Sequence, residues 1–272
     1  AGIKVSERAQ YIRTIMDELQ RIDSHLLFYS CLAMDMGALT PFFYGFRERE
    51  MILDIFEDTT GGRLIQNYNV IGGVQADLHP DFVRKTKEFI VYLRSIIYEY
   101  HDIFTKSVIA RTRLKGVGLL SREDAISLGC TGGTGRASGW ANDVRKHHPY
   151  AMYGKVDFKE ITYTHGDAFD RYMVRMDEIM ESCRIIEQLI DNVPEGEFRV
   201  KTKPILKLPE GVFQPRRVRR VPHQPGGQDA LPFALPKHGA ALGACHGHRV
   251  SGREDSRPDC HRRYDGLRDT GY

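Results

Sequence analysis

The sequence lacks several features that would assign a function at once. No apolar run approaches the roughly 20 residues that a membrane-spanning helix needs. None of the five cysteines forms a C-x-x-C pair, and their spacing fits neither a zinc site nor a disulfide framework. An iron–sulfur cluster takes about four thiolates. We therefore expect no metal centre held by this chain alone.

A complete phosphate-binding loop is also absent. Residues 132–139 read GGTGRASG, but Ser138 stands where a dinucleotide fingerprint needs its third glycine, and no Gly-Lys-Ser/Thr sequence closes a P-loop. We interpret residues 129–153 as a long, polar, structural loop. Arg136, Asp143 and Arg145 would pair within it.

Positive charge is scarce in most of the chain. The net charge is +3, but residues 214–272 hold ten arginines and one lysine against six acidic residues, which leaves 28 basic against 30 acidic residues elsewhere. A nearly neutral body has no broad cationic surface for nucleic acid. Residues 214–272 also contain no isoleucine and no regular apolar period, so we expect a disordered tail.

The body of the chain contains long helical patterns. Apolar residues spaced by three and four predict helices over residues 7–34, 80–106 and 166–192. Thr40 and Pro41 begin another helix, which ends at residues 59–62. We further predict a short helix over 121–128, irregular chain over 63–78 and extended chain over 200–212. The fold class is therefore mainly α, a bundle of long helices.

Several polar residues invite more than one interpretation. Residues 47–50 (RERE) point around a helix, so they form either a buried ion-pair network or a solvated face. His25 would pack or hydrogen-bond at a helix contact, whereas residues 147–148 would be a surface pair of histidines. Asp35 stands between two methionines, where burial would favour its neutral form unless a cation compensates. It is either a functional acid or a helix-terminal cap.

Residues 34–50, MDMGALTPFFYGFRERE, strongly resemble the 49-kDa-type (D) subunit of complex I. The similarity continues in order along the chain, from about residue 4 to residue 213. Further matching blocks lie at residues 62–64, 68, 71–74, 115–118, 131–132, 136–139, 143–146, 149–150, 170–171 and 203–204.

The resemblance implies a fold of the nickel–iron hydrogenase large-subunit type, without that family's metal-binding thiolates and with a little β structure at the ends. It implies a subunit of a proton-translocating NADH:quinone oxidoreductase, inactive alone. The partners would be a small subunit that holds the terminal iron–sulfur cluster, other complex I subunits and, peripherally, membrane subunits. Quinone would bind between the two quinone-module subunits. The location implied is the cytoplasmic side of a bacterial inner membrane.

The resemblance also assigns roles to residues. Asp35 would be the acid of a proton relay, paired with a quinone-binding histidine that lies upstream of this sequence, so we expect an N-terminally truncated chain. The residues expected to border the quinone cavity are Leu39, Thr40, Pro41, Phe42 and Phe43. Those expected near the partner's cluster are Arg63, Leu64, Ile65 and Tyr68.

Ile65 departs from the family pattern. A histidine often occupies this position and couples reduction of the cluster to its own protonation. Isoleucine cannot do so. We therefore expect a lower and nearly pH-independent cluster potential, which would suit menaquinone as the acceptor.

The expected organisation is a partial quinone-module domain over residues 1–213 and a non-native tail over 214–272. With permitted codons, reading parts of this tail one nucleotide later yields sequence that resembles the family's own C-terminus, so we interpret it as a frameshift. The alternative is a genuine basic tail that binds lipid or nucleic acid.

Two other functions stay open at this stage. The chain could be the matching subunit of a related complex fed by coenzyme F420, ferredoxin or formate, because it binds no electron donor itself. It could also be a truncated, non-catalytic fragment that merely docks on its small subunit.

Overall fold

Helix α1 (Glu7–Asp35) is the central element of the structure, a computed structural model that describes residues 3–202. Ser6 caps it, because its hydroxyl accepts a hydrogen bond from the backbone N–H of Ala9 at 3.3 Å. The helix confirms the prediction for residues 7–34 to within one residue. Its buried apolar side chains are Ala9, Ile12, Ile15, Met16, Leu19, Ile22, Leu26, Tyr29 and Ala33.

Helix α2 (Leu39–Thr60) follows α1 after a tight turn and packs along it. Gly37 has a φ of +83° in this turn, a conformation that glycine adopts without strain. The two helices approach closely at Gly45. A Cβ atom there would lie 2.0 Å from Ser30 Oγ and 3.1 Å from the Leu26 carbonyl oxygen. The α1–α2 crossing therefore requires a residue without a side chain.

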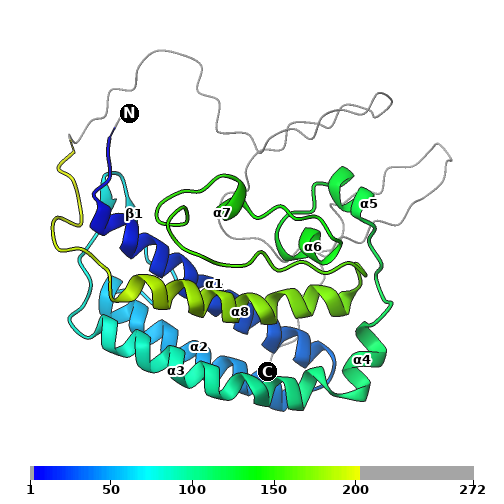
Figure 1. The fold of residues 1–272 in the computed structure, drawn as a ribbon. Coiled ribbons are helices and arrows are strands. Elements are labelled where there is room, and N and C mark those ends of the chain that lie inside the picture. Colours follow the sequence, from blue (N-terminus) through cyan, green and yellow to red (C-terminus); the bar gives the residue numbers. More distant parts are fainter. Residues whose placement is uncertain (1–2, 203–272) are drawn as a thin grey trace, which may run out of the picture. The chain divides into compact units, whose positions relative to one another are not determined.

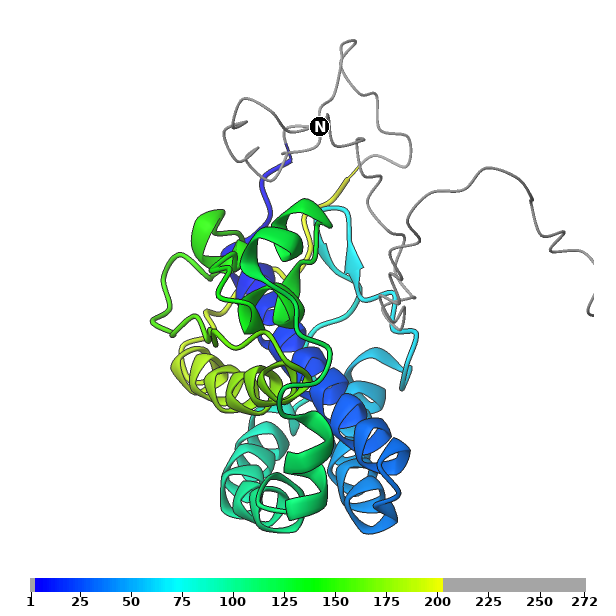
Figure 2. The same cartoon turned by 90° about the vertical axis from the view of Figure 1, so that its right-hand side faces the viewer.

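Helices α3 (Phe82–Tyr100) and α8 (Ala168–Ile190) complete the bundle. Figures 1 and 2 show α2 and α3 on one side of the layer formed by α1 and α8. The helix predicted over 80–106 does not continue as a regular α-helix to its end. It closes in a π-helical turn, η1 (His101–Thr105), in which the Lys106 N–H bonds the His101 carbonyl at 2.8 Å.

The chain between α3 and α8 forms four short helices, α4 (Val108–Leu114), α5 (Arg122–Ser127), α6 (Gly132–Ala137) and α7 (Val144–His147). Helices α5, α6 and α7 lie on the opposite side of α1 and α8 from α2 and α3, whereas α4 lies beside the end of α3 (Figure 1). Ser121 caps the predicted short helix by accepting from the Asp124 N–H at 3.0 Å. The interpretation of residues 129–153 as loop throughout was wrong, because two helical turns interrupt it.

The small amount of β structure is an antiparallel hairpin between α2 and α3, formed by β1 (Asn69–Val70) and β2 (Gly73–Val74). Arg199 adds an isolated bridge to Gly73. Most of the extended segment predicted over 200–212, and the whole predicted tail over 214–272, lie outside the described residues. No helix within residues 3–202 combines the length and apolar character needed to cross a membrane.

We predict that Gly45→Ala lowers the free energy of unfolding by about 1–3 kcal/mol, because the added methyl group forces α1 and α2 apart. Urea unfolding followed by circular dichroism measures the change. The control is Gly133→Ala, whose Cβ would meet only side-chain atoms of Arg175 and Val174, the nearest at 3.4 Å. Equal effects of the two substitutions would contradict the close crossing.

Candidate functional site

Asp35 lies at the C-terminal end of α1, beside the turn into α2. Its side chain is exposed, as is that of Met34. The condition of burial, under which Asp35 would favour its neutral form, is therefore not met in this chain alone. The backbone at this corner is held by Arg113, whose guanidinium donates to the Met36 carbonyl at 3.3 Å.

The residues expected to border a quinone cavity form the first turn of α2, next to Asp35. Leu39 is 58% exposed and Phe43 62% exposed, whereas Pro41 is buried. Thr40 is exposed as well. The half-buried ring of Phe42 packs against Phe43, with centroids 5.4 Å apart. This corner is thus an open apolar surface, not a closed cavity.

The residues expected near a cluster follow the other end of α2. Arg63 folds back onto that helix, where it pairs with Asp54 at 2.8 Å, with Glu57 at 2.7 Å and with Glu50. Leu64 and Ile65 are 65% and 85% exposed. Tyr68 differs from them, because it is buried and donates its hydroxyl to the Ala76 carbonyl at 2.8 Å.

The structure does not bring these two groups together. The 22 residues of α2 span about 33 Å at the usual rise of an α-helix, and the groups lie at its two ends. Each end presents exposed apolar side chains, while Glu50, Asp54 and Glu57 form an acidic stretch between them that binds Arg63.

Residues 47–50 form a buried ion-pair network in part and a solvated face in part. The Glu48 carboxylate is fully buried and accepts from Arg47 Nε at 2.6 Å, from the Tyr92 hydroxyl at 3.0 Å and from the Tyr100 hydroxyl. Arg49 pairs with the buried Asp23 of α1 at 3.1 Å. The side chains of Arg47 and Glu50 remain largely in solvent.

A buried ion-pair network joins α1 to the chain between α3 and α8. The Glu18 carboxylate, fully buried, accepts from Arg145 Nη1 at 2.9 Å, from the Tyr153 hydroxyl at 2.5 Å and from the Ser182 hydroxyl at 2.6 Å. Burial alone would raise the pKa of Glu18, but the charges of Arg21 and Arg145 outweigh it and lower that pKa. We call these residues the Glu18 cluster.

A second buried carboxylate, Glu178 of α8, lies across from His25 of α1. Its Oε2 is 2.8 Å from His25 Nε2, and its Oε1 accepts from Arg136 Nε at 2.7 Å. Burial would raise the pKa of Glu178, but the hydrogen bond from His25 and the charge of Arg136 lower it to about 2. Burial also lowers the pKa of His25. The predicted role of His25 at a helix contact is confirmed.

The predicted pairing of Arg136, Asp143 and Arg145 inside one loop holds only in part. Arg145 Nη2 does bind Asp143 at 2.7 Å, but Arg136 instead reaches Glu178 on α8. Sequence reasoning missed Glu18 and Glu178 altogether. The available signal was their position, since each carboxylate falls on the apolar face of a long amphipathic helix, where a charge needs a partner.

His147 is exposed, with Nε2 3.2 Å from the Ala141 carbonyl oxygen, as expected for a surface histidine. Within residues 3–202, no group of three histidine, cysteine, aspartate or glutamate side chains is arranged to hold a metal ion.

We predict that stability falls in acid through Glu178. Its pKa of about 2 lies below its ordinary value of 4.5. Its charged form thus stabilises the fold above pH 4.5, and about 3 kcal/mol is lost as the pH falls towards 2. Glu178→Gln should flatten this acid loss in urea titrations between pH 7 and pH 3. Glu187→Gln, on an exposed part of the same helix, is the control, and an unchanged acid loss in Glu178→Gln would contradict the assignment.

The sequence and the fold both match known proteins. A family profile described as the 49 Kd subunit of respiratory-chain NADH dehydrogenase matches residues 35–223. The C/D subunit of the NADH-quinone oxidoreductase of Bacteroides fragilis is 77% identical over 212 residues, which cover 78% of this chain and 40% of that protein. The D subunit of the Desulfotalea psychrophila enzyme is 44% identical, covering 78% of this chain and 57% of that protein.

A solved structure agrees with these relatives. A chain of the membrane-bound sulfane sulfur reductase, described as an archaeal respiratory membrane complex, superposes with a TM-score of 0.71 and 34% identity, over 74% of this chain and 54% of that chain. This chain spans about two fifths of the length of the Bacteroides fragilis relative. Its mainly α fold and the resemblance first carried by residues 34–50 are confirmed. The chain belongs to the family of 49-kDa subunits of respiratory-chain NADH dehydrogenases.

Proposed function

We propose that this chain forms, with a small subunit that holds an iron–sulfur cluster, the quinone-reduction site of a proton-translocating NADH:quinone oxidoreductase. The observation that carries the proposal is the apolar surface at Leu39 and Phe43, which stays open beside Asp35. An exposed apolar surface next to an acid is suited to closure by a partner around an apolar substrate. The names of the relatives agree with this assignment.

Quinone reduction requires two electrons and two protons. The cluster, held by the partner, would supply the electrons, and this chain would supply a proton route and part of the cavity wall. Asp35 is the acid of that route. Leu39, Thr40, Pro41, Phe42 and Phe43 would line the apolar wall beside it.

Asp35 acts through an intervening group in this proposal. The residues expected near the cluster follow the C-terminal end of α2, whereas Asp35 precedes the N-terminal end of that helix. The quinone would bind along the wall from Leu39 to Phe43, and a group between it and Asp35 would carry the proton. This arrangement fits the paired histidine that the family resemblance implies, which would pass the proton onward.

The finer assignments follow from the same resemblance. We infer that the acceptor is menaquinone, and that the complex is attached peripherally to the cytoplasmic side of a bacterial inner membrane, where membrane subunits move protons. Residues 1–213 would be a partial quinone-module domain, and 214–272 a frameshifted tail.

We predict that Asp35→Asn in the assembled complex lowers NADH:quinone reductase activity by about 10²-fold or more, since a positioned acid contributes that much. NADH:ferricyanide activity, which takes electrons before the quinone, should stay unchanged. Asp102→Asn, an exposed acid paired with Lys106, serves as the control. Full quinone reductase activity in Asp35→Asn would refute the role.

A second prediction concerns Ile65. The potential of the partner's cluster should change little between pH 6 and pH 8, because isoleucine binds no proton. Ile65→His should introduce a slope approaching 59 mV per pH unit, the value for one electron coupled to one proton. Redox titration of the complex followed by electron paramagnetic resonance measures both. A normal slope in the unmodified complex would rule out this explanation.

A further inference from the structure

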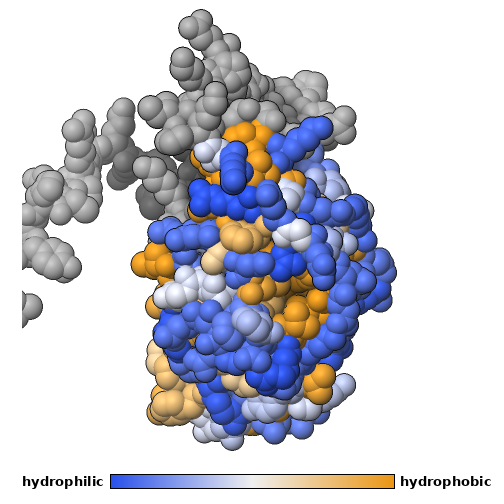
Figure 3. Space-filling view, turned by 90° about the vertical axis from the view of Figure 1, so that its left-hand side faces the viewer, coloured by the Kyte–Doolittle hydropathy of each residue, from blue (hydrophilic) through white to orange (hydrophobic). Residues whose placement is uncertain are grey.

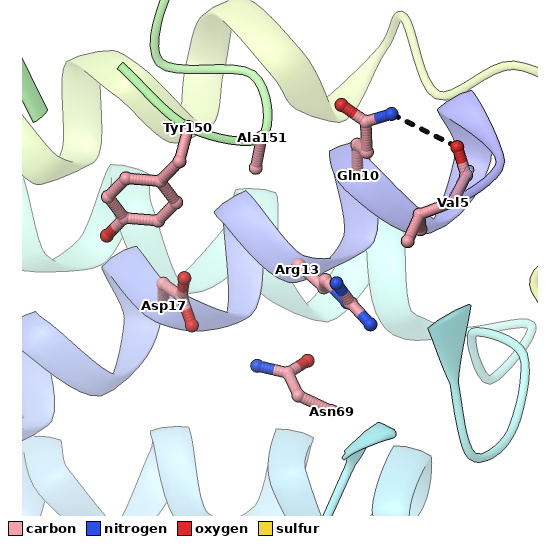
Figure 4. Close-up of a pocket in the computed structure, with 7 residues that line it drawn as sticks. All are labelled: Val5, Gln10, Arg13, Asp17, Asn69, Tyr150 and Ala151. Atoms are coloured by element: carbon pink, nitrogen blue, oxygen red, sulfur yellow. Dashed lines mark hydrogen bonds between the residues drawn. The ribbon is translucent and has the colours of Figure 1, made fainter. Parts of the chain in front are cut away.

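A cavity of about 430 Å³ opens between the N-terminal half of α1, the β hairpin and the loop before residue 153. Gln10, Arg13 and Asp17 line it from α1, at a helical spacing that places them on one stripe. Asn69 of β1 and Tyr150 of the loop complete its polar walls (Figure 4). None of these residues has a part in the proposed quinone chemistry.

The two arginines nearest to Asp17 have other partners. Arg13 directs Nη2 at the carbonyl oxygens of Val70 and Gly73, at 2.7 Å and 2.6 Å. Arg21 directs Nε at the Glu18 carboxylate, at 3.3 Å from the nearer oxygen. No ion pair of Asp17 is found among residues 3–202, although the cavity holds its carboxylate away from bulk water.

The groups that face Asp17 leave its charge poorly compensated. Burial and the neighbouring Glu18 raise the pKa of Asp17 to about 6, while Arg21, Arg13 and the side-chain amide of Asn69 offset this only in part. The facing Tyr150 phenol adds no compensating charge, since burial and the neighbouring Asp17 raise its pKa and keep it neutral. A carboxylate in this setting gains from an added cation.

The cavity also offers an aromatic wall. Tyr150 is 45% exposed and its ring is held edge-on against Tyr153, with centroids 4.8 Å apart. Ala151 has a φ of +44°, which is uncommon for a residue other than glycine and fixes the loop here. Figure 4 shows the Tyr150 ring and the Asp17 carboxylate on the same side of α1. A carboxylate next to an aromatic ring is the combination that binds guanidinium and ammonium groups.

The geometry points to a binding site for a cationic group on a short alkyl chain, a guanidinium or a primary ammonium, held by Asp17 and covered by Tyr150. Two sources can present this chemistry, a free small amine or guanidine and an arginine or lysine side chain of a neighbouring polypeptide. The cavity admits either, because about 430 Å³ exceeds the volume of one such side chain.

Calorimetric titration of the full 272-residue chain with propylguanidinium tests the chemistry. We expect saturable binding at pH 7.5. It should weaken about tenfold at pH 5, where a carboxyl group with a pKa of about 6 is roughly one-tenth ionised. Asp17→Asn should weaken it at least tenfold at pH 7.5, whereas the control Asp102→Asn should not. Tyr150→Leu should weaken it a few-fold, the usual worth of one cation–π contact.

The same titration on the assembled complex separates the two sources. If a free cation is the ligand, propylguanidinium still binds in the complex. If a partner's side chain fills the cavity, binding is lost on assembly, and Asp17→Asn weakens retention of that partner. Circular dichroism melts confirm that each variant is folded. Absence of saturable binding to the isolated chain, or equal binding by the parent and Asp17→Asn, overturns the proposal. Loss of quinone reductase activity does not bear on it.

Discussion

The buried carboxylate of Glu18 is the interaction on which the arrangement of this chain depends. Two segments far from Glu18 in the sequence donate to it: the chain before α8, through Arg145 and Tyr153, and α8 itself, through Ser182. A charge removed from water is tolerated only when its hydrogen-bonding capacity is filled. The position of α1 relative to α8 and to the loop before α8 is therefore fixed by a network that is satisfied in one arrangement and costly in any other.

The buried networks around Glu18 and Glu178 hold the bundle together without the exposed apolar side chains. Glu18 and Glu178 engage the inner faces of α1 and α8, and exposed apolar side chains lie at both ends of α2, among other places. Figure 3 shows the face at the left of Figure 1, where hydrophobic side chains form separate patches among hydrophilic ones. Leu39, Phe43 and Ile65 are exposed because the bundle is already complete without them. Surfaces of this kind belong to a subunit built for assembly.

The sequence predicts the long helices well because their information is local. Apolar residues at spacings of three and four follow directly from burial of one face, and the caps at Ser6 and Ser121 use short-range hydrogen bonds. The turn η1 could not be predicted in this way, because its apolar period continues that of α3. Its geometry is accompanied by a tertiary contact, the hydrogen bond between Thr105 Oγ1 and the Tyr172 hydroxyl at 2.6 Å.

The candidate site was less predictable, since it depends on long-range partners. Nothing in the residues around Asp35 reveals that α1 ends in solvent, or that Arg63 turns back to three acids on α2. The family motif identified the surface, but the pairing of Arg136 with Glu178 rather than with its sequence neighbours required the fold.

The sequence distance between these partners has a consequence for synthesis. His25 and Glu178 are 153 residues apart, and Glu18 and Ser182 are 164 apart. At ribosomal speeds of about 5–20 residues per second, α1 leaves the ribosome roughly 8–30 s before α8 does. During that interval Glu18 lacks the hydrogen bond from Ser182, and the apolar stripe of α1 has no cover from α8. Helix α1 is thus made before α8 but is fully stabilised only after it, and a chaperone that shields a long amphipathic helix would act at this stage.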